Sequence, residues 1–109
     1  MSEIYFKLAS NENQYQEFNV GLTTLKVVLT YNNFNNRYYL TFYKNFDVVV
    51  KSIKLVVTQN NLLASYYYKD IGYFSAVVED YEFDSNGKKV YKEITKDNLT
   101  DVIFRWQYE

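Results

Sequence analysis

Residues 24–43 read Thr-Leu-Lys-Val-Val-Leu-Thr-Tyr, then Asn-Asn-Phe-Asn-Asn, then Arg-Tyr-Tyr-Leu-Thr-Phe-Tyr. Apolar side chains recur at every second position on both sides of the asparagines, which is the period of a strand with one buried face. Asn tolerates positive φ and bonds its own neighbouring backbone, so the asparagine cluster predicts the turn of a β-hairpin. The alternating residues are Leu25, Val27, Leu29 and Tyr31 before the asparagines and Tyr38, Leu40 and Phe42 after them.

The rest of the chain repeats this pattern in shorter pieces. In the next strand towards the N-terminus, alternation places Phe18, Val20 and Leu22 on one side. In the strand that follows the central hairpin, alternation fails, which predicts a β-bulge near Lys51 and Ser52. Outside the central hairpin we expect strands at residues 3–8, 16–22, 48–57, 73–83, 88–94 and 101–108.

The connections between these strands are short. Asp84-Ser85-Asn86-Gly87 is the strongest turn signal in the chain and predicts a second hairpin. Residues 60–65 and 95–100 break the strand pattern, and each suits one helical turn. A chain of 109 residues is one domain, 1–109. Together these signals predict an all-β fold, a small antiparallel β-barrel or sandwich of about seven or eight short strands.

The composition narrows the chemistry. The chain holds no Cys and no His, which excludes disulfides, thiolate metal sites, His-based nucleophile pairs and most zinc sites. We therefore expect no enzymatic activity, no cofactor and no metal. The net charge of −1 gives no electrostatic reason to expect a nucleic acid or an anionic membrane. The N-terminus has no basic segment leading into an apolar core, and no apolar run approaches the roughly 18 residues of a transmembrane helix, so we expect cytoplasmic synthesis.

Two polar patterns come close to functional motifs. Glu82 to Glu93 matches the spacing of a calcium-binding loop, with Gly87 at its sixth position. Glu stands first where Asp is expected, Lys89 replaces an apolar residue, and the flanks read as strands, so an Asn-Gly hairpin turn is the preferred interpretation. A cluster of carboxylates suggests general acid and base work, although a solvated strand face explains it as well. These carboxylates are Glu79, Asp80, Glu82 and Asp84.

Tyrosine is the compositional outlier, with 13 Tyr beside 8 Phe and no Pro. The candidate partner-interface residues are Tyr39, Tyr43, Tyr66, Tyr67 and Tyr68, of which Tyr39 and Tyr43 fall on the outer face of the central hairpin. Exposed tyrosines mark protein interfaces because a rigid ring supplies contact area at low entropic cost. Such rings equally stack on sugars, and any one of them is as readily core or plain strand surface. A protein interface and a glycan site therefore both stay open.

The order and spacing of several segments resemble the baseplate plug family of contractile-tailed bacteriophages and related tail-like particles. The clearest segment is Asn36-Arg37-Tyr38-Tyr39-Leu40. The chain departs from the family pattern at Tyr38, where Trp is frequent, at Ser52, where Gly is common, and in lacking the prolines usual in the later loops. The other segments are Phe18-x-Val20-x-Leu22, Leu25-x-Val27-x-Leu29-x-Tyr31-Asn32, Ile53-Lys54-Leu55-Val56, Asn61-Leu62-Leu63, Ile71-Gly72-Tyr73-Phe74, Leu99 and Val102-Ile103-Phe104.

This resemblance implies a structural virion protein that plugs the central hub channel of a contractile tail baseplate, below the tail tube. Such a plug holds back the genome and the tape measure until sheath contraction displaces it. The implied partners are baseplate hub, tail tube or tape-measure proteins, with an oligomer in the assembly allowed, and no cofactor comes with the family. From the charge and the lack of a long apolar run we expect no nucleic-acid or membrane partner. The implied location is the virion tail baseplate, after synthesis in the host cytoplasm.

Residue chemistry offers an alternative from a different class, a small β-domain that binds glycans on the host surface. The arrangement of the candidate tyrosines separates the two hypotheses. Stacking on a glycan requires one flat exposed row of rings, whereas a protein surrounded by partners spreads them over several faces. We expect the spread arrangement for Tyr39, Tyr43 and Tyr66 to Tyr68.

Overall fold

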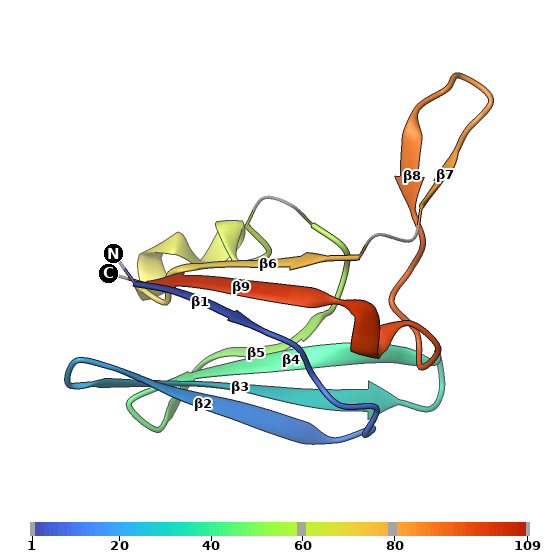
Figure 1. The fold of residues 1–109 in the computed structure, drawn as a ribbon. Helices are drawn as coiled ribbons and strands as arrows, with labels where there is room; N and C mark the ends of the chain where they lie inside the picture. The colour runs from blue at the N-terminus through green and yellow to red at the C-terminus, as the bar shows by residue number, and fades with distance from the viewer. Residues whose placement is uncertain (1, 59–60, 79–80, 109) are drawn as a thin grey trace.

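The computed structural model describes residues 2–58, 61–78 and 81–108, and for Tyr67 and Tyr68 the backbone alone. Within these residues the chain forms nine antiparallel strands in three sheets (Figure 1). The four-stranded sheet runs in the order β2 (Gln14–Val20), β3 (Thr23–Asn32), β4 (Arg37–Lys44) and β5 (Asp47–Lys54). The three-stranded sheet runs in the order β1 (Ser2–Phe6), β9 (Ile103–Tyr108) and β6 (Tyr73–Val77). The remaining elements are the hairpin of β7 (Tyr81–Phe83) and β8 (Lys89–Tyr91) and the short 3₁₀ helices η1 (Ala64–Lys69) and η2 (Leu99–Asp101).

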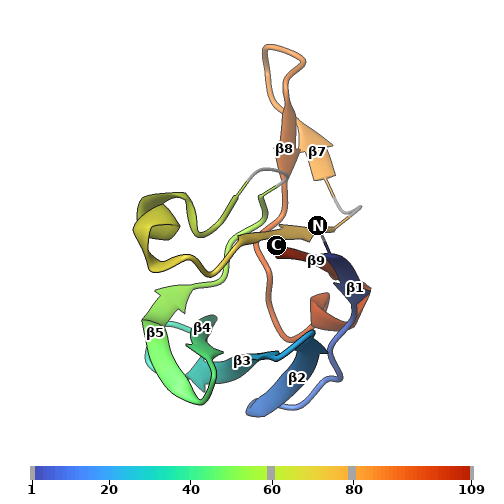
Figure 2. The ribbon, with the colours of Figure 1, turned by 90° about the vertical axis from the view of Figure 1, so that its left-hand side faces the viewer.

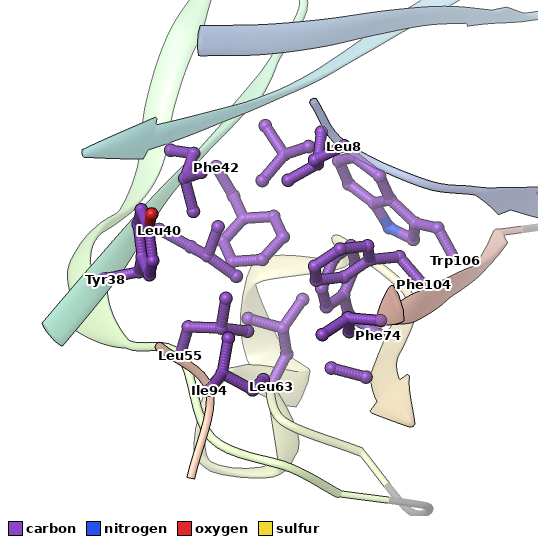
Figure 3. Packing of buried hydrophobic residues seen from close by; sticks show 14 of the residues in the cluster. Leu8, Tyr38, Leu40, Phe42, Leu55, Leu63, Phe74, Ile94, Phe104 and Trp106 are labelled. Atoms are coloured by element: carbon purple, nitrogen blue, oxygen red, sulfur yellow. The ribbon is translucent and has the colours of Figure 1, made fainter. Parts of the chain in front are cut away.

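The two larger sheets face each other as the layers of a sandwich (Figure 1, Figure 2). Fully buried aromatic side chains fill the space between the layers (Figure 3). The Phe42 ring of one sheet packs edge-on against Phe74 and Trp106 of the other, with centroid distances of 4.9 and 5.4 Å. Such T-shaped pairs are favourable beyond the area that they bury. The predicted all-β fold is confirmed as a sandwich, and across the described strands the sheets do not close into a barrel.

The central hairpin forms as predicted. β3 and β4 pair with Leu29 opposite Leu40, and the alternating apolar side chains face the core. In the turn, Asn32 Oδ1 accepts a hydrogen bond from the Phe34 amide at 2.8 Å, and Asn36 adopts a φ of 57°. The asparagines thus supply both the side-chain acceptor and the left-handed backbone of the turn.

β5 contains the predicted bulge. Two of its residues, Lys51 and Ser52, together oppose the single residue Thr41 of β4. Ser52 has a φ of 53°, which is uncommon for a residue other than Gly, and its amide donates to Thr41 Oγ1 at 3.1 Å. The extra residue keeps Val50 and Ile53 on the core side although they are three positions apart. Glycine adopts this φ without strain, so Ser52 is held in it by the bulge and by its hydrogen bond to Thr41.

The prediction for Leu22 is wrong. The sequence pattern places it on the buried side, but β2 ends at Val20 and Leu22 is fully exposed. Gly21, with a φ of 60°, begins the two-residue turn into β3 and ends the alternation. The turn therefore takes the apolar side chain out of the strand register and into solvent.

Other predicted boundaries also differ: the strands expected at 3–8, 48–57 and 88–94 are the shorter β1, β5 and β8. The strand predicted at residues 73–83 is divided into β6 and β7, and residues 79–80 lie outside the described residues. The helical turns predicted at residues 60–65 and 95–100 are the 3₁₀ helices η1 and η2, each displaced towards the C-terminus. At the first of them, Asn61 Oδ1 accepts hydrogen bonds from the amides of Leu63 and Phe74 at 2.9 and 3.0 Å, which ties the start of the predicted turn to β6, and the 3₁₀ helix begins after it.

A tight loop locks β9 to the rest of the body. Inside the core, Trp106 Nε1 donates a hydrogen bond to the Ile71 carbonyl oxygen at 2.8 Å. The next residue, Gly72, has a φ of 87°, and a Cβ atom there would lie 2.2 Å from the carbonyl oxygen of Gln107. Because that distance is far inside van der Waals contact, glycine is required at this position.

Candidate partner interface

The outer face of the four-stranded sheet carries two tyrosines arranged around Lys26. The Lys26 Nζ atom lies 4.4 Å from the ring centroid of Tyr43 on β4 and 5.6 Å from that of Tyr15 on β2. An ammonium over an aromatic face is attracted by the ring quadrupole, so these contacts order the three side chains relative to one another. Tyr15, Lys26 and Tyr43 thus form one ordered group on this face.

Tyr39 shares a strand face with Tyr43 but has a different neighbourhood. Asn35 Nδ2 donates to Tyr39 Oη at 2.7 Å, which ties the ring to the turn between β3 and β4. Tyr39 also lines a recess of about 350 Å³ beside this turn, and Tyr43 is not part of the recess. The other lining residues are Thr30, Tyr31, Asn32, Asn33, Phe34 and Ser52.

The structure separates the remaining predicted tyrosines from this face. Tyr66 belongs to η1 and packs, half-buried, against the hydrophobic core. η1 lies on the side of β6, away from the outer face of the four-stranded sheet (Figure 1). The side chains of Tyr67 and Tyr68 lie outside the described residues. Tyr39, Tyr43 and Tyr66 therefore do not form one exposed row.

Tyr15 is the residue of this face that the sequence analysis missed. Its side chain is 63% exposed, more than that of any of the predicted tyrosines whose side chains are described. The predicted strand begins at Gln16, whereas β2 begins at Gln14. Extending the alternation towards the N-terminus would have placed Tyr15 outward together with Glu17.

Exposed apolar side chains also occur on other parts of the surface. They include Tyr5, Tyr73 and Ile103 on the three-stranded sheet, Leu22, Phe34 and Phe46 in the turns of the four-stranded sheet, Val48 on β5, and Phe83 and Val90 in the β7–β8 hairpin. Aromatic residues are enriched in protein interfaces relative to the rest of a protein surface. The distribution favours contacts on several sides over a single binding groove.

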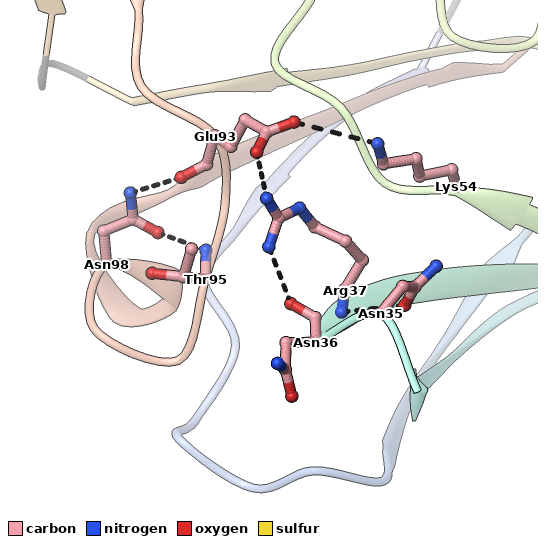
Figure 4. A network of polar contacts seen from close by, with 7 residues as sticks. All are labelled: Asn35, Asn36, Arg37, Lys54, Glu93, Thr95 and Asn98. Carbon is pink, nitrogen blue, oxygen red and sulfur yellow. Dashed lines mark hydrogen bonds and ion pairs between the residues drawn. The ribbon is translucent and has the colours of Figure 1, made fainter. Parts of the chain in front are cut away.

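A polar network fixes the segment that follows β8 (Figure 4). The Arg37 guanidinium pairs with the Glu93 carboxylate, which Lys54 Nζ also approaches at 3.7 Å. Asn98 Nδ2 donates to the Glu93 carbonyl oxygen at 2.9 Å, and Asn98 Oδ1 accepts from the Thr95 amide at 2.8 Å. The network anchors the C-terminal base of the β7–β8 hairpin to the four-stranded sheet.

At the other end of β4, Lys44 connects the two layers of the sandwich. Its Nζ atom donates to the Asp70 carbonyl oxygen at 3.1 Å and lies 3.2 Å from Asp70 Oδ2. It also lies 5.4 Å from the ring centroid of Tyr108 at the end of β9. A hydrogen bond with Tyr108, assisted by Asp70 and opposed by burial, raises the pKa of Lys44 above its ordinary value of 10.5.

The carboxylates singled out in the sequence give no support for a metal or catalytic site. Asp84 Oδ1 accepts hydrogen bonds from the amides of Asn86 and Lys88 at 2.9 and 2.8 Å, so it closes the predicted hairpin turn. Glu79 and Asp80 lie outside the described residues. In the described part of the chain, no three His, Cys, Asp or Glu side chains are placed to share a metal ion. The helices described are too short and too polar for any of them to cross a membrane.

The fold and its exposed side chains define a small antiparallel β-sandwich with aromatic residues on several faces. Residues 1–108 match the family described as cyanophage baseplate Pam3 plug gp18, and the chain belongs to this family. It is therefore a structural protein of a phage tail baseplate, a component of the virion tail that interacts with other baseplate or tail proteins. The resemblance found in the sequence is confirmed. A search among curated proteins finds no match to the chain.

Proposed function

We propose that this protein plugs the central channel of the baseplate hub through protein–protein contacts. The observation that carries the proposal is the distribution of exposed aromatic and apolar side chains over both outer sheet faces, the turns and the hairpin. A protein enclosed in a channel is covered on many sides, and aromatic anchors dominate the energetics of such contacts. Membership of a plug family supports the same role.

The proposed partners are baseplate hub, tail tube or tape-measure proteins. The face that carries Tyr15, Tyr39 and Tyr43 is the proposed contact surface for one of them, because it presents rings that are already held in place by Lys26 and Asn35. Preorganised side chains lose little conformational entropy when a partner covers them. The role requires neither enzymatic activity nor a cofactor. We infer that the protein is made in the host cytoplasm before the baseplate is assembled.

The packed core suits a plug that is displaced as one body. The rings of Phe42, Phe74 and Trp106 interlock between the sheets and are fully buried. Interiors packed in this way have low compressibility and transmit strain. Sheath contraction would then move the sandwich out of the channel without first unfolding it.

The test is recovery of the protein in assembled particles. Tagged full-length protein is made in cells that produce the phage, and the proteins that copurify with it are identified by mass spectrometry. We expect hub, tube or tape-measure proteins among them. Tyr15→Ser combined with Tyr43→Ser should lower this recovery by about tenfold, whereas Tyr15→Phe combined with Tyr43→Phe keeps the rings and should recover the same partners. A protein that is absent from wild-type particles contradicts the proposal.

Glycan binding is the second candidate, and the recess beside Tyr39 is the observation that favours it. Phe34 and Tyr39 supply aromatic surface there, and Asn32 and Asn33 supply amides that can bond sugar hydroxyls. A glycan array probed with the wild-type protein and with Tyr39→Ala tests this role. Binding that the variant loses, from a protein that does not enter the baseplate, would replace the plug proposal.

A further inference from the structure

The β7–β8 hairpin stands apart from the sandwich in both views (Figure 1, Figure 2). Every residue from 82 to 90 is exposed, and among the described strands the hairpin shares no ladder with the other two sheets. Each of its strands is 3 residues long. An isolated two-stranded hairpin is marginal in water, and a third strand or a covered face is needed for independent stability. A partner that covers one face of the hairpin would therefore stabilise it.

One face of the hairpin collects aromatic rings. The register pairs Tyr81 with Tyr91 and Phe83 with Lys89, which places these four side chains on the same face. The Tyr81 ring centroid lies 5.6 Å from that of Phe83 and 5.9 Å from that of Tyr91. Lys89 Nζ lies 4.0 Å from the Tyr81 centroid. Phe83 remains 67% exposed. We call these four residues the hairpin face, with Phe83 as its most exposed ring.

The charge next to the hairpin face is positive. The Asp84 carboxylate is occupied by backbone amides in the turn. Glu82 points to the opposite face, where it lies 3.9 Å from Lys92 Nζ. Lys89 therefore holds its ammonium group over the rings of this face, and the exposed Lys88 precedes it in the chain. An acidic surface on the partner complements this arrangement.

We propose that the hairpin face inserts into a groove on another baseplate protein, with an apolar floor that receives Phe83 and carboxylates at the rim that face Lys88 and Lys89. This inference rests on the proposed function and names the element that makes one of its contacts. Nucleic acid is disfavoured because its binding depends on several cations that neutralise phosphates, whereas the hairpin carries the carboxylates of Glu82 and Asp84 as well as these lysines, and the chain has a net charge of −1. The Arg37–Glu93 network fixes the base of the hairpin and lowers the entropic cost of insertion.

The first experiment measures incorporation into particles. Phe83→Ser combined with Lys89→Gln should lower the amount of full-length protein per purified particle by about tenfold or more, the loss expected when a buried anchor side chain is removed. The matched control is Phe83→Leu combined with Lys89→Arg, which keeps an apolar side chain and a positive charge at the same two positions and should leave incorporation unchanged. Circular dichroism melting of both variants should superimpose on the wild-type curve, which shows that the sandwich is folded.

The second experiment identifies what the hairpin touches. A zero-length carbodiimide reagent applied to purified particles joins an amine to a carboxylate that it already contacts. We expect Lys88 or Lys89 to be linked to Asp or Glu of a different protein. Links to a second copy of this chain would overturn the proposed occupant. Nucleic acid is tested with a fluorescein-labelled oligothymidine. If it binds the free wild-type protein but not the variant with Lys88→Gln and Lys89→Gln, the proposed protein partner is overturned in favour of nucleic acid.

The two proposals fail in different ways. Wild-type protein that is missing from particles overturns the plug function and, with it, the hairpin contact. Wild-type protein that is present, with the Phe83→Ser and Lys89→Gln variant incorporated to the same level, overturns the hairpin contact alone and leaves the plug function standing.

Discussion

The sandwich body and the β7–β8 hairpin are both antiparallel β-structure, but they are stabilised by different interactions. In the body, Phe42 and Trp106 pack between two sheets and are withdrawn entirely from water. In the hairpin, Phe83 is exposed and Val90 is 49% exposed, and the hydrogen bonds to Asp84 in the turn hold the strands together. Burial contributes roughly 25 cal/mol for each Å² of apolar surface, so the body supplies most of the folding free energy.

The difference separates stability from recognition within one small chain. A side chain that is buried in the free protein has no surface left to offer a partner, whereas Phe83 offers most of its ring. A plug needs a body that holds its shape and separate elements that make contacts. Substitutions at matched positions of the body and the hairpin test whether stability and recognition are separated in this way.

The largest contrast is expected between Leu29 and Val90. Leu29 is fully buried on β3, so Leu29→Ala should reduce the free energy of unfolding by about 2 to 5 kcal/mol. Val90→Ala should reduce it by less than about 0.5 kcal/mol, because the side chain is already half in water. Denaturant unfolding of both variants measures the two values. A loss below about 0.5 kcal/mol for Leu29→Ala would mean that the core face of β3 has been wrongly assigned.

A second contrast uses two glycines that both have positive φ. Gly72 has no room for a side chain because of the Gln107 carbonyl oxygen, whereas no atom lies within 4 Å of the Cβ position at Gly87 in the hairpin turn. Gly72→Ala should cost about 2 to 4 kcal/mol, of which about 1 to 2 kcal/mol comes from the left-handed backbone alone.

Gly87→Ala is the matched substitution in the hairpin. It should strain the turn locally but lower the global free energy of unfolding by less than about 0.5 kcal/mol, since the hairpin shares no ladder with the described strands of the body and we expect it to open without them. Thermal melts of the two alanine variants at equal concentration give the comparison. Equal losses at Gly72 and Gly87 would show that hairpin and body unfold together.

The sequence predicts the body better than the surface, for a physical reason. A buried face leaves an alternating pattern in the chain, and both strands of the central hairpin and the bulge at Ser52 could be found from it. Leu22 breaks the pattern because a turn, and not a strand, decides its exposure. The division of sequence 73–83 into β6 and β7 has no local signal, since both halves alternate.

The candidate interface could be predicted only in part. Alternation correctly assigns Tyr39 and Tyr43 to the outer face of β4, but the contribution of Tyr15 depends on where β2 begins. Tyr66 packs against the core because the 3₁₀ helix turns it inward, and strand periodicity carries no information about that turn. The identity of the protein that covers these rings depends on the surface of that partner, and this sequence carries no record of that surface.

Alkaline pH offers a third contrast, between Lys44 in the body and Lys89 in the hairpin. The pKa of Lys44 in the folded state is raised above the value of 10.5 that it takes in the unfolded chain, so the folded protein holds this proton more tightly. The stabilisation is therefore fully present below pH 10.5 and is lost as pH rises through the folded-state pKa.

Lys44→Met removes that contribution while keeping the aliphatic stem. At neutral pH the variant should be less stable than the wild type by about 1 kcal/mol, and the difference should shrink above pH 10.5. Lys89→Met should leave the global free energy of unfolding unchanged across the same pH range, because Lys89 is exposed on the hairpin. Urea titrations at a series of pH values provide the curves. A constant difference between wild type and Lys44→Met would contradict a pKa raised by folding.

The smallest effect is expected at the junction between the two regions, where the Arg37 guanidinium meets the Glu93 carboxylate. The Glu93 side chain is 59% exposed, and pairs of this kind contribute about 0.2 to 1 kcal/mol. A double-mutant cycle with Arg37→Ala and Glu93→Ala should give a coupling energy in that range, and it should weaken in high salt because exposed charges are screened. A coupling above about 2 kcal/mol would make the base of the hairpin part of the cooperative body, and the separation of stability from recognition would then have to begin further along the hairpin.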